Sequence, residues 1–281
     1  EINDVIEYVK KLDLITTKVH IAKKYNLSKP EIIESESSCL DIKQLRHPLI
    51  EHILEKELYV PNDIIFNENI QRGVCLYGFN AVGKSSFVKS IGISVVMAQA
   101  GFYVPCEKML YKPYKKLFTR ILSNDNLFKN QSTYMVEILE LKIILEKKDK
   151  HSLILGDELC HGTEIDSAVG INIACLEELY DAKSSFIFAT HLHELVRFKE
   201  ITEKPFLSLK HISVVYDEES GTLLYERKLL DGNGSSLYGL EVAKYLKLDR
   251  EFINKALHIR NKHNKLTMGD NLSVLEKPLN H

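Results

Sequence analysis

The chain has 281 residues, of which 44% are hydrophobic, so it can bury one large core with smaller additions around it. It carries 37 Lys and Arg residues against 39 Asp and Glu residues. The resulting formal charge of -2 excludes a chain whose whole surface binds polyanions. Any contact with nucleic acid therefore needs a local patch, or a part of the protein outside this sequence.

The five cysteines indicate an intracellular, reducing compartment. They form no C-x-x-C pair and their number is odd, which is typical of small core residues. No apolar stretch reaches the length of a membrane span and no signal-peptide pattern opens the chain, so we expect no membrane contact. Cytoplasm, mitochondrion and nucleus are not separated by the sequence. Because the first residue is Glu1 and not Met, we expect the chain to have been either processed or cut from a longer protein, and we favour the second.

The sequence predicts four parts in chain order. Residues 1–38 form a helix with an apolar seam of period 3 and 4, followed by a polar linker. Residues 39–233 alternate short apolar runs with longer helical stretches, which predicts an α/β domain with a mostly parallel sheet flanked by helices; a hairpin is expected within 213–229. Residues 234–263 contain two short helices separated near Asp249, a good N-cap, and residues 264–281 are polar and predicted to be a loose tail or linker.

The stretch "LYGFNAVGKSSF" satisfies the pattern G-x-x-x-x-G-K-[ST] with Gly78, Gly83, Lys84 and Ser85. The glycines let backbone N–H groups point at phosphate oxygens, and the following helix adds its positive N-terminal end. Lys84 would reach the β- and γ-phosphates, and Ser85 would bind Mg²⁺ through its hydroxyl. An apolar strand precedes the loop and a helix follows it, so a phosphate-binding loop is favoured over a simple glycine turn.

Two further apolar runs end in groups that suit the same site. "SLILGDE" ends in Asp157, which can hold the Mg²⁺ shell, and Glu158, which can polarise an attacking water. "SFIFAT" is followed by His191, which faces the same crevice and could bind the γ-phosphate. The alternatives are a solvated strand end and a structural histidine. The adjacent acid favours a P-loop ATPase of the ABC/SMC type over a kinase.

The chain contains, in this order, the motifs "LRHPLIE", "GFNAVGKSS", "QSTYMVEILE", "DELCHGTEID", "ATHLHEL" and "LDGNGSSLYGLEVAKYLKL". Together they make the chain resemble the C-terminal half of the MutS family of DNA mismatch-repair ATPases. "LRHPLIE" is similar to the family's R-H-P-x-[IV]-E strand, and "GFNAVGKSS" to its G-P-N-M-x-G-K-S loop. "QSTYMVEILE" resembles S-T-F-M-V-E-M, "DELCHGTEID" resembles D-E-x-x-R-G-T-[ST], and "ATHLHEL" is close to A-T-H-Y-x-E-L. "LDGNGSSLYGLEVAKYLKL" resembles the segment that ends S-Y-G-x-x-V-A, with Leu237 in place of Ser.

The resemblance implies ATP and Mg²⁺ as ligands and assigns further roles. Ser132 would reach the nucleotide held by a partner chain, although it also suits the N-cap of the next helix. Tyr59 would stack on the adenine base, and Arg227 would lie near a second position beside the base. Catalytic roles fall to Glu158, Lys84, His191 and Ser132, and metal binding to Ser85 and Asp157. The nucleotide-binding set is Tyr59, Gly78, Phe79, Asn80, Ala81, Val82, Gly83, Lys84, Ser85 and Ser86.

The resemblance also implies partners. Two ATPase domains would face each other in a homodimer, or in a heterodimer with a paralogue, and the C-terminal helices would be a dimerisation appendage. A reading of DNA by these helices is the alternative. The N-terminal helix would be the end of a lever arm that joins the ATPase to a DNA clamp. Double-stranded mismatched DNA would be bound by an N-terminal half that this sequence lacks.

Two departures from the family pattern affect the loop that crosses the expected dimer interface. His161 stands where the family usually has Arg, and Glu164 stands where it has Ser or Thr. They indicate an outlying branch of the family, viral or organellar. Some such branches carry a nuclease domain after the ATPase, and the tail of this chain would be the start of a linker to one. Two alternative functions stay open: an ATP-gated structural clamp with little turnover, and a recombination-related MutS branch without mismatch recognition.

Overall fold

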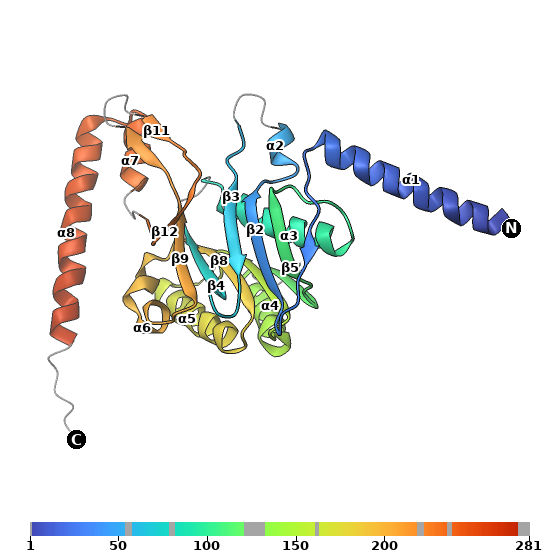
Figure 1. Ribbon diagram of the computed structural model, residues 1–281. Helices are drawn as coiled ribbons and strands as arrows, with labels where there is room; N and C mark the ends of the chain where they lie inside the picture. The colour runs from blue at the N-terminus through green and yellow to red at the C-terminus, as the bar shows by residue number, and fades with distance from the viewer. Residues whose placement is uncertain are drawn as a thin grey trace, which may run out of the picture. The chain divides into compact units, whose positions relative to one another are not determined.

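The computed structural model describes residues 2–53, 58–78, 82–120, 133–160, 163–217, 222–234 and 238–274. Figure 1 shows its helices and strands. Contacts between residues divide the chain into two units, Glu1–Ser213 with Glu226–Gly234 and Val214–Tyr225 with Ser235–His281. The domain boundaries expected from the sequence stay predictions.

A six-stranded sheet forms the centre of the first unit (Figure 1). Its strand order is β12-β9-β4-β8-β7-β6, and all neighbours are parallel except the edge strand β12. The three apolar runs predicted as strands are fully buried neighbours in this sheet, which confirms a mixed α/β fold. The bounds are β4 (Gly73–Tyr77), β6 (Lys116–Arg120), β7 (Ser152–Asp157), β8 (Ser185–Thr190), β9 (Leu207–Ile212) and β12 (Leu229–Asp231).

Helices cover both faces of this sheet, because successive side chains of a strand point to opposite faces. Ile154 lies in one core cluster with residues of α4 (Thr133–Lys147) and α5 (Ile165–Asp181). Its neighbour Leu155 faces the other way and packs on α3 (Lys84–Gln99), where Gly92 leaves room for it. After β8 the chain forms a 3₁₀ helix, η1 (His193–Arg197), and the short helix α6 (Lys199–Thr202).

A second sheet, which the sequence did not predict, has the strand order β1-β5-β2-β3. The segment "RHPLIE" is not a strand as expected. It follows β2 as a turn and then the short helix α2, where the His47 ring accepts hydrogen bonds from the backbone N–H groups of Leu49 and Ile50. The bounds are β1 (Glu31–Ile32), β2 (Cys39–Leu45), α2 (Ile50–Ile53), β3 (Asn62–Phe66) and β5 (Lys108–Lys112).

The predicted N-terminal helix is α1 (Ile2–Lys24). Most of its side chains are exposed, including the apolar seam residues Ile2, Val5, Val9 and Leu12. No helix in the described part of the chain is both long enough and apolar enough to cross a membrane.

The second unit contains a hairpin and two helices. Strands β10 (Val215–Asp217) and β11 (Thr222–Leu224) pair antiparallel, which confirms the predicted hairpin. Between α7 (Tyr238–Tyr245) and α8 (Arg250–Val274), the carboxylate of Asp249 accepts the backbone N–H groups of Glu251 and Phe252 at 3.0 Å, which confirms the N-cap. Helix α8 continues past residue 263 to Val274, and this segment contains no proline that would interrupt the helix.

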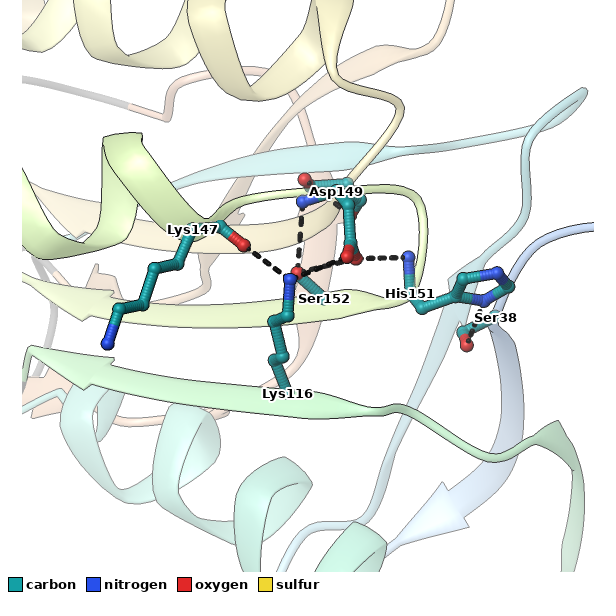
Figure 2. A network of polar contacts seen from close by, with 7 residues as sticks. Ser38, Lys116, Lys147, Asp149, His151 and Ser152 are labelled. Atoms are coloured by element: carbon teal, nitrogen blue, oxygen red, sulfur yellow. Dashed lines mark hydrogen bonds and ion pairs between the residues drawn. The ribbon is translucent and has the colours of Figure 1, made fainter.

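A polar network joins the amino ends of β6 and β7, at the edge of the sheet opposite the candidate site (Figure 2). Asp149 accepts hydrogen bonds from Lys116 at 2.6 Å, from the backbone N–H of His151 at 2.8 Å and from Ser152 at 2.9 Å. The ring of His151 lies 3.1 Å from the hydroxyl of Ser38, which precedes β2. The network therefore fixes the start of two parallel strands and ties the second sheet to them.

Candidate functional site

The candidate site lies where three adjacent parallel strands end. Strand β4 leads through the glycine loop into α3, β7 ends in Asp157, and β8 is followed by His191. Carboxyl ends of parallel strands share one edge of a sheet, so the groups that follow them converge.

The glycine loop depends on backbone conformation. Gly78 has a φ of 149° and Gly83 a φ of 111°, which L side chains rarely adopt. At Gly83, the N-cap of α3, a Cβ would meet nothing within 4 Å, so the φ and not the space requires glycine there. Val82 is buried, and Ser85 and Ser86 are half-buried. Phe79, Asn80 and Ala81 lie outside the described residues.

Lys84 is the first residue of α3 and is 4% exposed. Its ammonium group donates to the carbonyl of Gly78 and lies 3.9 Å from the Glu158 carboxylate. Burial lowers the pKa of Lys84, against the opposing effect of Glu158 and Asp157. The two carboxylates therefore hold a positive charge at the place where the loop would receive phosphate.

Glu158 lies between Lys84 and His191. Its carboxylate is 3.7 Å from Nδ1 of His191, and its backbone N–H donates to the carbonyl of Ala189 on β8 at 2.9 Å. The backbone of Glu158 is left-handed, with a φ of 51°. Such strain in a residue that is not glycine occurs where the surroundings enforce it, and it concentrates at functional sites.

The chemistry of two groups near the loop fits a magnesium ion. The hydroxyl of Ser85 and the buried carboxylate of Asp157 are hard oxygen donors, the type that Mg²⁺ takes together with phosphate oxygens. Among the described residues there is no group of three or more His, Cys, Asp or Glu side chains that could hold a metal ion. An ion bound jointly by the protein and a phosphate ligand fits this donor set.

A pocket of about 140 Å³ lies beside the glycine loop, and Tyr59 and Arg227 both contribute to its wall. These are the two residues that the family resemblance placed beside the base. The sequence reasoning missed most of the other lining residues, since no motif marks them. The lining is Ile50, Tyr59, Val60, Asn62, Val82, Gly83, Ser86, Phe87, Ile212 and Arg227.

Tyr59 and Arg227 are both held by neighbouring groups. The hydroxyl of Tyr59 is hydrogen-bonded to Ser90 on α3. Burial, together with the nearby Glu51 carboxylate, raises the pKa of Tyr59 to about 12, although Arg227 and the bond to Ser90 act to lower it. Arg227 has a left-handed backbone, with a φ of 56°. The amide of Asn62 donates to the Arg227 carbonyl at 2.9 Å and accepts from the backbone N–H of Leu229 at 2.7 Å. Asn62 therefore fixes the backbone that carries Arg227.

Of the residues expected at a dimer interface, the structure describes Glu164. Ser132 and His161 lie outside the described residues. Glu164 precedes α5, and its carboxylate accepts hydrogen bonds from Ser167 and Thr163, which lower the pKa of Glu164 to about 2. Glu164 is therefore negatively charged at any neutral pH.

A buried ion pair, also missed from the sequence, lies close to the strained segment that follows β7. Arg120, the last residue of β6, donates to the carboxylate of Glu137 on α4 at 2.6 Å. Both side chains are buried, and both influence the Cys160 thiol, whose pKa is raised to about 11 by burial and by Glu137. The pair joins the residues on either side of segment 121–132.

Comparisons with known proteins agree with these motifs. The family model of MutS domain V matches residues 74–265, more than half of the chain. A putative DNA mismatch repair protein mutS homolog of Acanthamoeba polyphaga mimivirus is 34% identical over the whole chain, and a mitochondrial DNA mismatch repair protein mutS homolog of Sarcophyton glaucum is 36% identical over 91% of it. The DNA mismatch repair protein MutS of Thermotoga sp. (strain RQ2) is 35% identical over 90% of the chain.

The alignments cover 28%, 26% and 31% of these three relatives, so the chain spans less than a third of their length. The match to MutS domain V supports the resemblance to the C-terminal ATPase half of the family. By the extent of the family match and by its glycine loop, acidic strand end and histidine, the chain belongs to the MutS domain V family.

Proposed function

We propose that the chain is the ATP-binding and ATP-hydrolysing module of a MutS-like DNA mismatch-recognition protein. One observation carries this proposal. Behind the glycine loop, the Glu158 carboxylate lies within 4 Å of both the Lys84 ammonium group and the His191 ring. The proposal is supported by membership of the MutS domain V family and by relatives named as DNA mismatch repair proteins.

In the proposed reaction, Glu158 orients and polarises the attacking water, since its carboxylate lies 3.9 Å from Lys84 at the end of the loop. Lys84 exchanges its bond to the Gly78 carbonyl for the β- and γ-phosphate oxygens, and its charge stabilises the transferred phosphoryl group. His191 donates to the γ-phosphate from the end of β8. Ser85 and Asp157 would hold Mg²⁺, which neutralises phosphate charge when it is bound.

The pocket beside the loop would receive the adenine base. The ring of Tyr59, anchored through Ser90, supplies a stacking face. Arg227 carries a planar, permanently charged group, so it would attract the face of the base through a cation–π contact.

The proposed assembly is a dimer with two shared sites. Ser132 of one chain would complete the nucleotide site of the other, and α7 and α8 would serve as the dimerisation appendage. Helix α1, whose apolar seam is exposed, would connect the module to a DNA clamp. Mismatched double-stranded DNA would be bound by the part of the relatives that this chain does not cover.

An ATP-gated clamp with little turnover is the second candidate. The observation that favours it is Glu164, which places a fixed negative charge in the loop expected to cross the interface. A recombination-related MutS branch without mismatch recognition would share every residue of the site and differ outside this chain.

The test is the ATPase rate per chain as a function of protein concentration, for the wild type, Glu158→Gln and Ser132→Ala. We expect the specific rate to rise with concentration, and both variants to bind ATP without hydrolysing it. ATP binding without Glu158-dependent turnover at any concentration would favour the gated clamp.

A further inference from the structure

The segment that carries the proposed general base is strained at two positions. Glu158 has a φ of 51° and Cys160 a φ of 63°, so left-handed residues flank Leu159 on both sides. Neither is glycine, and side chains with a Cβ rarely stay in this conformation unless neighbouring groups enforce it. The direction of the Glu158 side chain therefore depends on whatever fixes residues 158–160.

One side of the segment is fixed by the sheet. The backbone N–H of Glu158 donates to the carbonyl of Ala189 on the neighbouring strand β8 at 2.9 Å. This bond continues the strand pairing by one residue past the end of β7. It does not by itself impose the left-handed turn at Cys160, two residues further on.

The other side is fixed by Asn172, a residue of α5 that is 2% exposed. Its side-chain amide donates to the carbonyl of Leu159 at 3.2 Å and to the helix carbonyl of Ala168 at 2.7 Å. The Leu159 carbonyl belongs to the peptide plane that joins Leu159 to Cys160, so its direction sets the orientation of the plane that leads into the strained Cys160. Leu159 and Cys160 are themselves buried, at 5% and 1% exposure.

A buried amide in a helix is usually replaced by an apolar residue unless its hydrogen bonds are needed, because burial of an unpaired polar group is costly. One hydrogen bond of the Asn172 amide stays within its own helix and is accepted by the Ala168 carbonyl. The second bond leaves the helix and reaches the site segment. It is this bond that connects a core position to the proposed catalytic carboxylate.

We propose that Asn172 is a positioning residue that holds the left-handed segment 158–160, and thereby keeps the Glu158 carboxylate between Lys84 and His191. The proposal rests on the proposed function for the role of Glu158. The hydrogen bond and the two backbone conformations carry it.

The first arm of the test uses the cysteines and needs no turnover. All five are buried and unpaired thiols, so each reacts with a maleimide when its surroundings open. In Asn172→Ala we expect Cys160 to react about tenfold faster or more, since the Leu159 carbonyl loses its partner. Cys39, Cys75, Cys106 and Cys175 should react at the wild-type rate, which peptide mapping would show.

The second arm measures ATP affinity and kcat separately. In Asn172→Ala we expect kcat to fall about tenfold or more while the Kd for ATP stays within about twofold, because the Lys84 loop is untouched. The control is Ile173→Val, the next residue of α5 in the same core, which trims the core and keeps the hydrogen bond from Asn172 to the Leu159 carbonyl. It should leave both values unchanged.

The third arm is rescue. Glycine adopts a positive φ without strain, so Cys160→Gly should restore a large part of kcat in the Asn172→Ala background. A merely structural role for Asn172 predicts no such rescue, since a second core truncation would add to the first.

Faster reaction of all five cysteines, or unchanged kcat despite a more reactive Cys160, would overturn the positioning role. If the wild-type chain binds ATP but shows no turnover, the proposed hydrolysis fails. The cysteine arm then still decides whether Asn172 holds the segment, so the two failures are distinguishable.

Discussion

Tyr59 is the side chain whose proposed role is easiest to isolate, because its ring and its hydroxyl have separate contacts. The ring contributes to the pocket wall, and the hydroxyl is bonded to Ser90. Tyr59→Ala removes the stacking face, so we expect ADP binding to weaken by about tenfold or more, in line with about 1–3 kcal/mol for stacking of a base on an aromatic ring.

Tyr59→Phe is the matched control. It keeps the ring and loses the hydrogen bond to Ser90, so we expect the Kd for ADP to change by less than about threefold. Calorimetric titration of both variants with ADP makes the comparison. Equal loss in the two variants would show that the hydroxyl, and not the ring, matters.

At the scale of elements, the central sheet depends on a glycine in β7. A Cβ on Gly156 would lie 2.2 Å from the ring of Phe188, its register partner on β8. Gly156→Ala should therefore lower the free energy of unfolding by about 1–3 kcal/mol through overpacking. Urea denaturation would measure this change.

Gly170→Ala, the same chemical change on α5, is the control. A Cβ there would meet nothing within 4 Å, and the residue is exposed. Alanine is favoured over glycine in a helix by about 0.5–1 kcal/mol, so this variant should be more stable than the wild type. Destabilisation by both variants would contradict the steric explanation.

The network at the amino ends of β6 and β7 makes the sheet sensitive to acid. Burial alone would raise the pKa of Asp149, but hydrogen bonds from Lys116, His151 and Ser152 lower it below its ordinary value. A carboxyl whose pKa is lowered by folding stabilises the fold above its unfolded-state pKa of about 3.9. That contribution disappears as the pH falls through the folded-state pKa.

Asp149→Asn should therefore be less stable than the wild type at pH 7, by about 1 kcal/mol or less, since the pair with Lys116 is more than a third exposed. Below about pH 5 the difference should shrink. Urea denaturation at several pH values measures it, and a difference that stays constant with pH would contradict the electrostatic account.

The sequence predicted those elements whose signals are local. The apolar runs at β4, β7 and β8 are buried on both faces and need no partner to be recognised. The second sheet was missed because β2 and β3 pair through a register shift between Ile42 and Leu45, which no periodicity reveals.

In the candidate site, the glycine loop and Asp157 belong to motifs that the sequence shows directly. Asn62 contacts a carbonyl 165 positions away and Asn172 one that lies 13 positions away, outside its own helix, and a single sequence carries no sign of such contacts.

At the scale of the whole molecule, the proposal requires sites shared between two chains. Glu158→Gln and Ser132→Ala should each be inactive alone, because one damages its own site and the other the site of its partner. Mixed in equal amounts, they should recover about a quarter of the wild-type rate, since about half of the dimers are mixed and each has one intact site.

The measurement is the steady-state ATPase rate after the two variants are mixed and allowed to exchange chains. A mixture of Glu158→Gln with Lys84→Met, both damaged in their own sites, is the control. In each mixed dimer both nucleotide sites then lack a group of their own, and no rate should return. An equal lack of activity in the two mixtures would contradict shared sites.

The bonds from Asn62 to residues 227 and 229 span 165 and 167 positions of the chain. They bear on how the protein is made. A ribosome releases α3 and most of the central sheet well before Arg227, which contributes to the wall of the pocket beside the glycine loop. A nascent chain can fold much of its core early, yet its pocket wall is completed only when Arg227 has emerged. Nucleotide can therefore stabilise the finished fold but gives little help to the growing one.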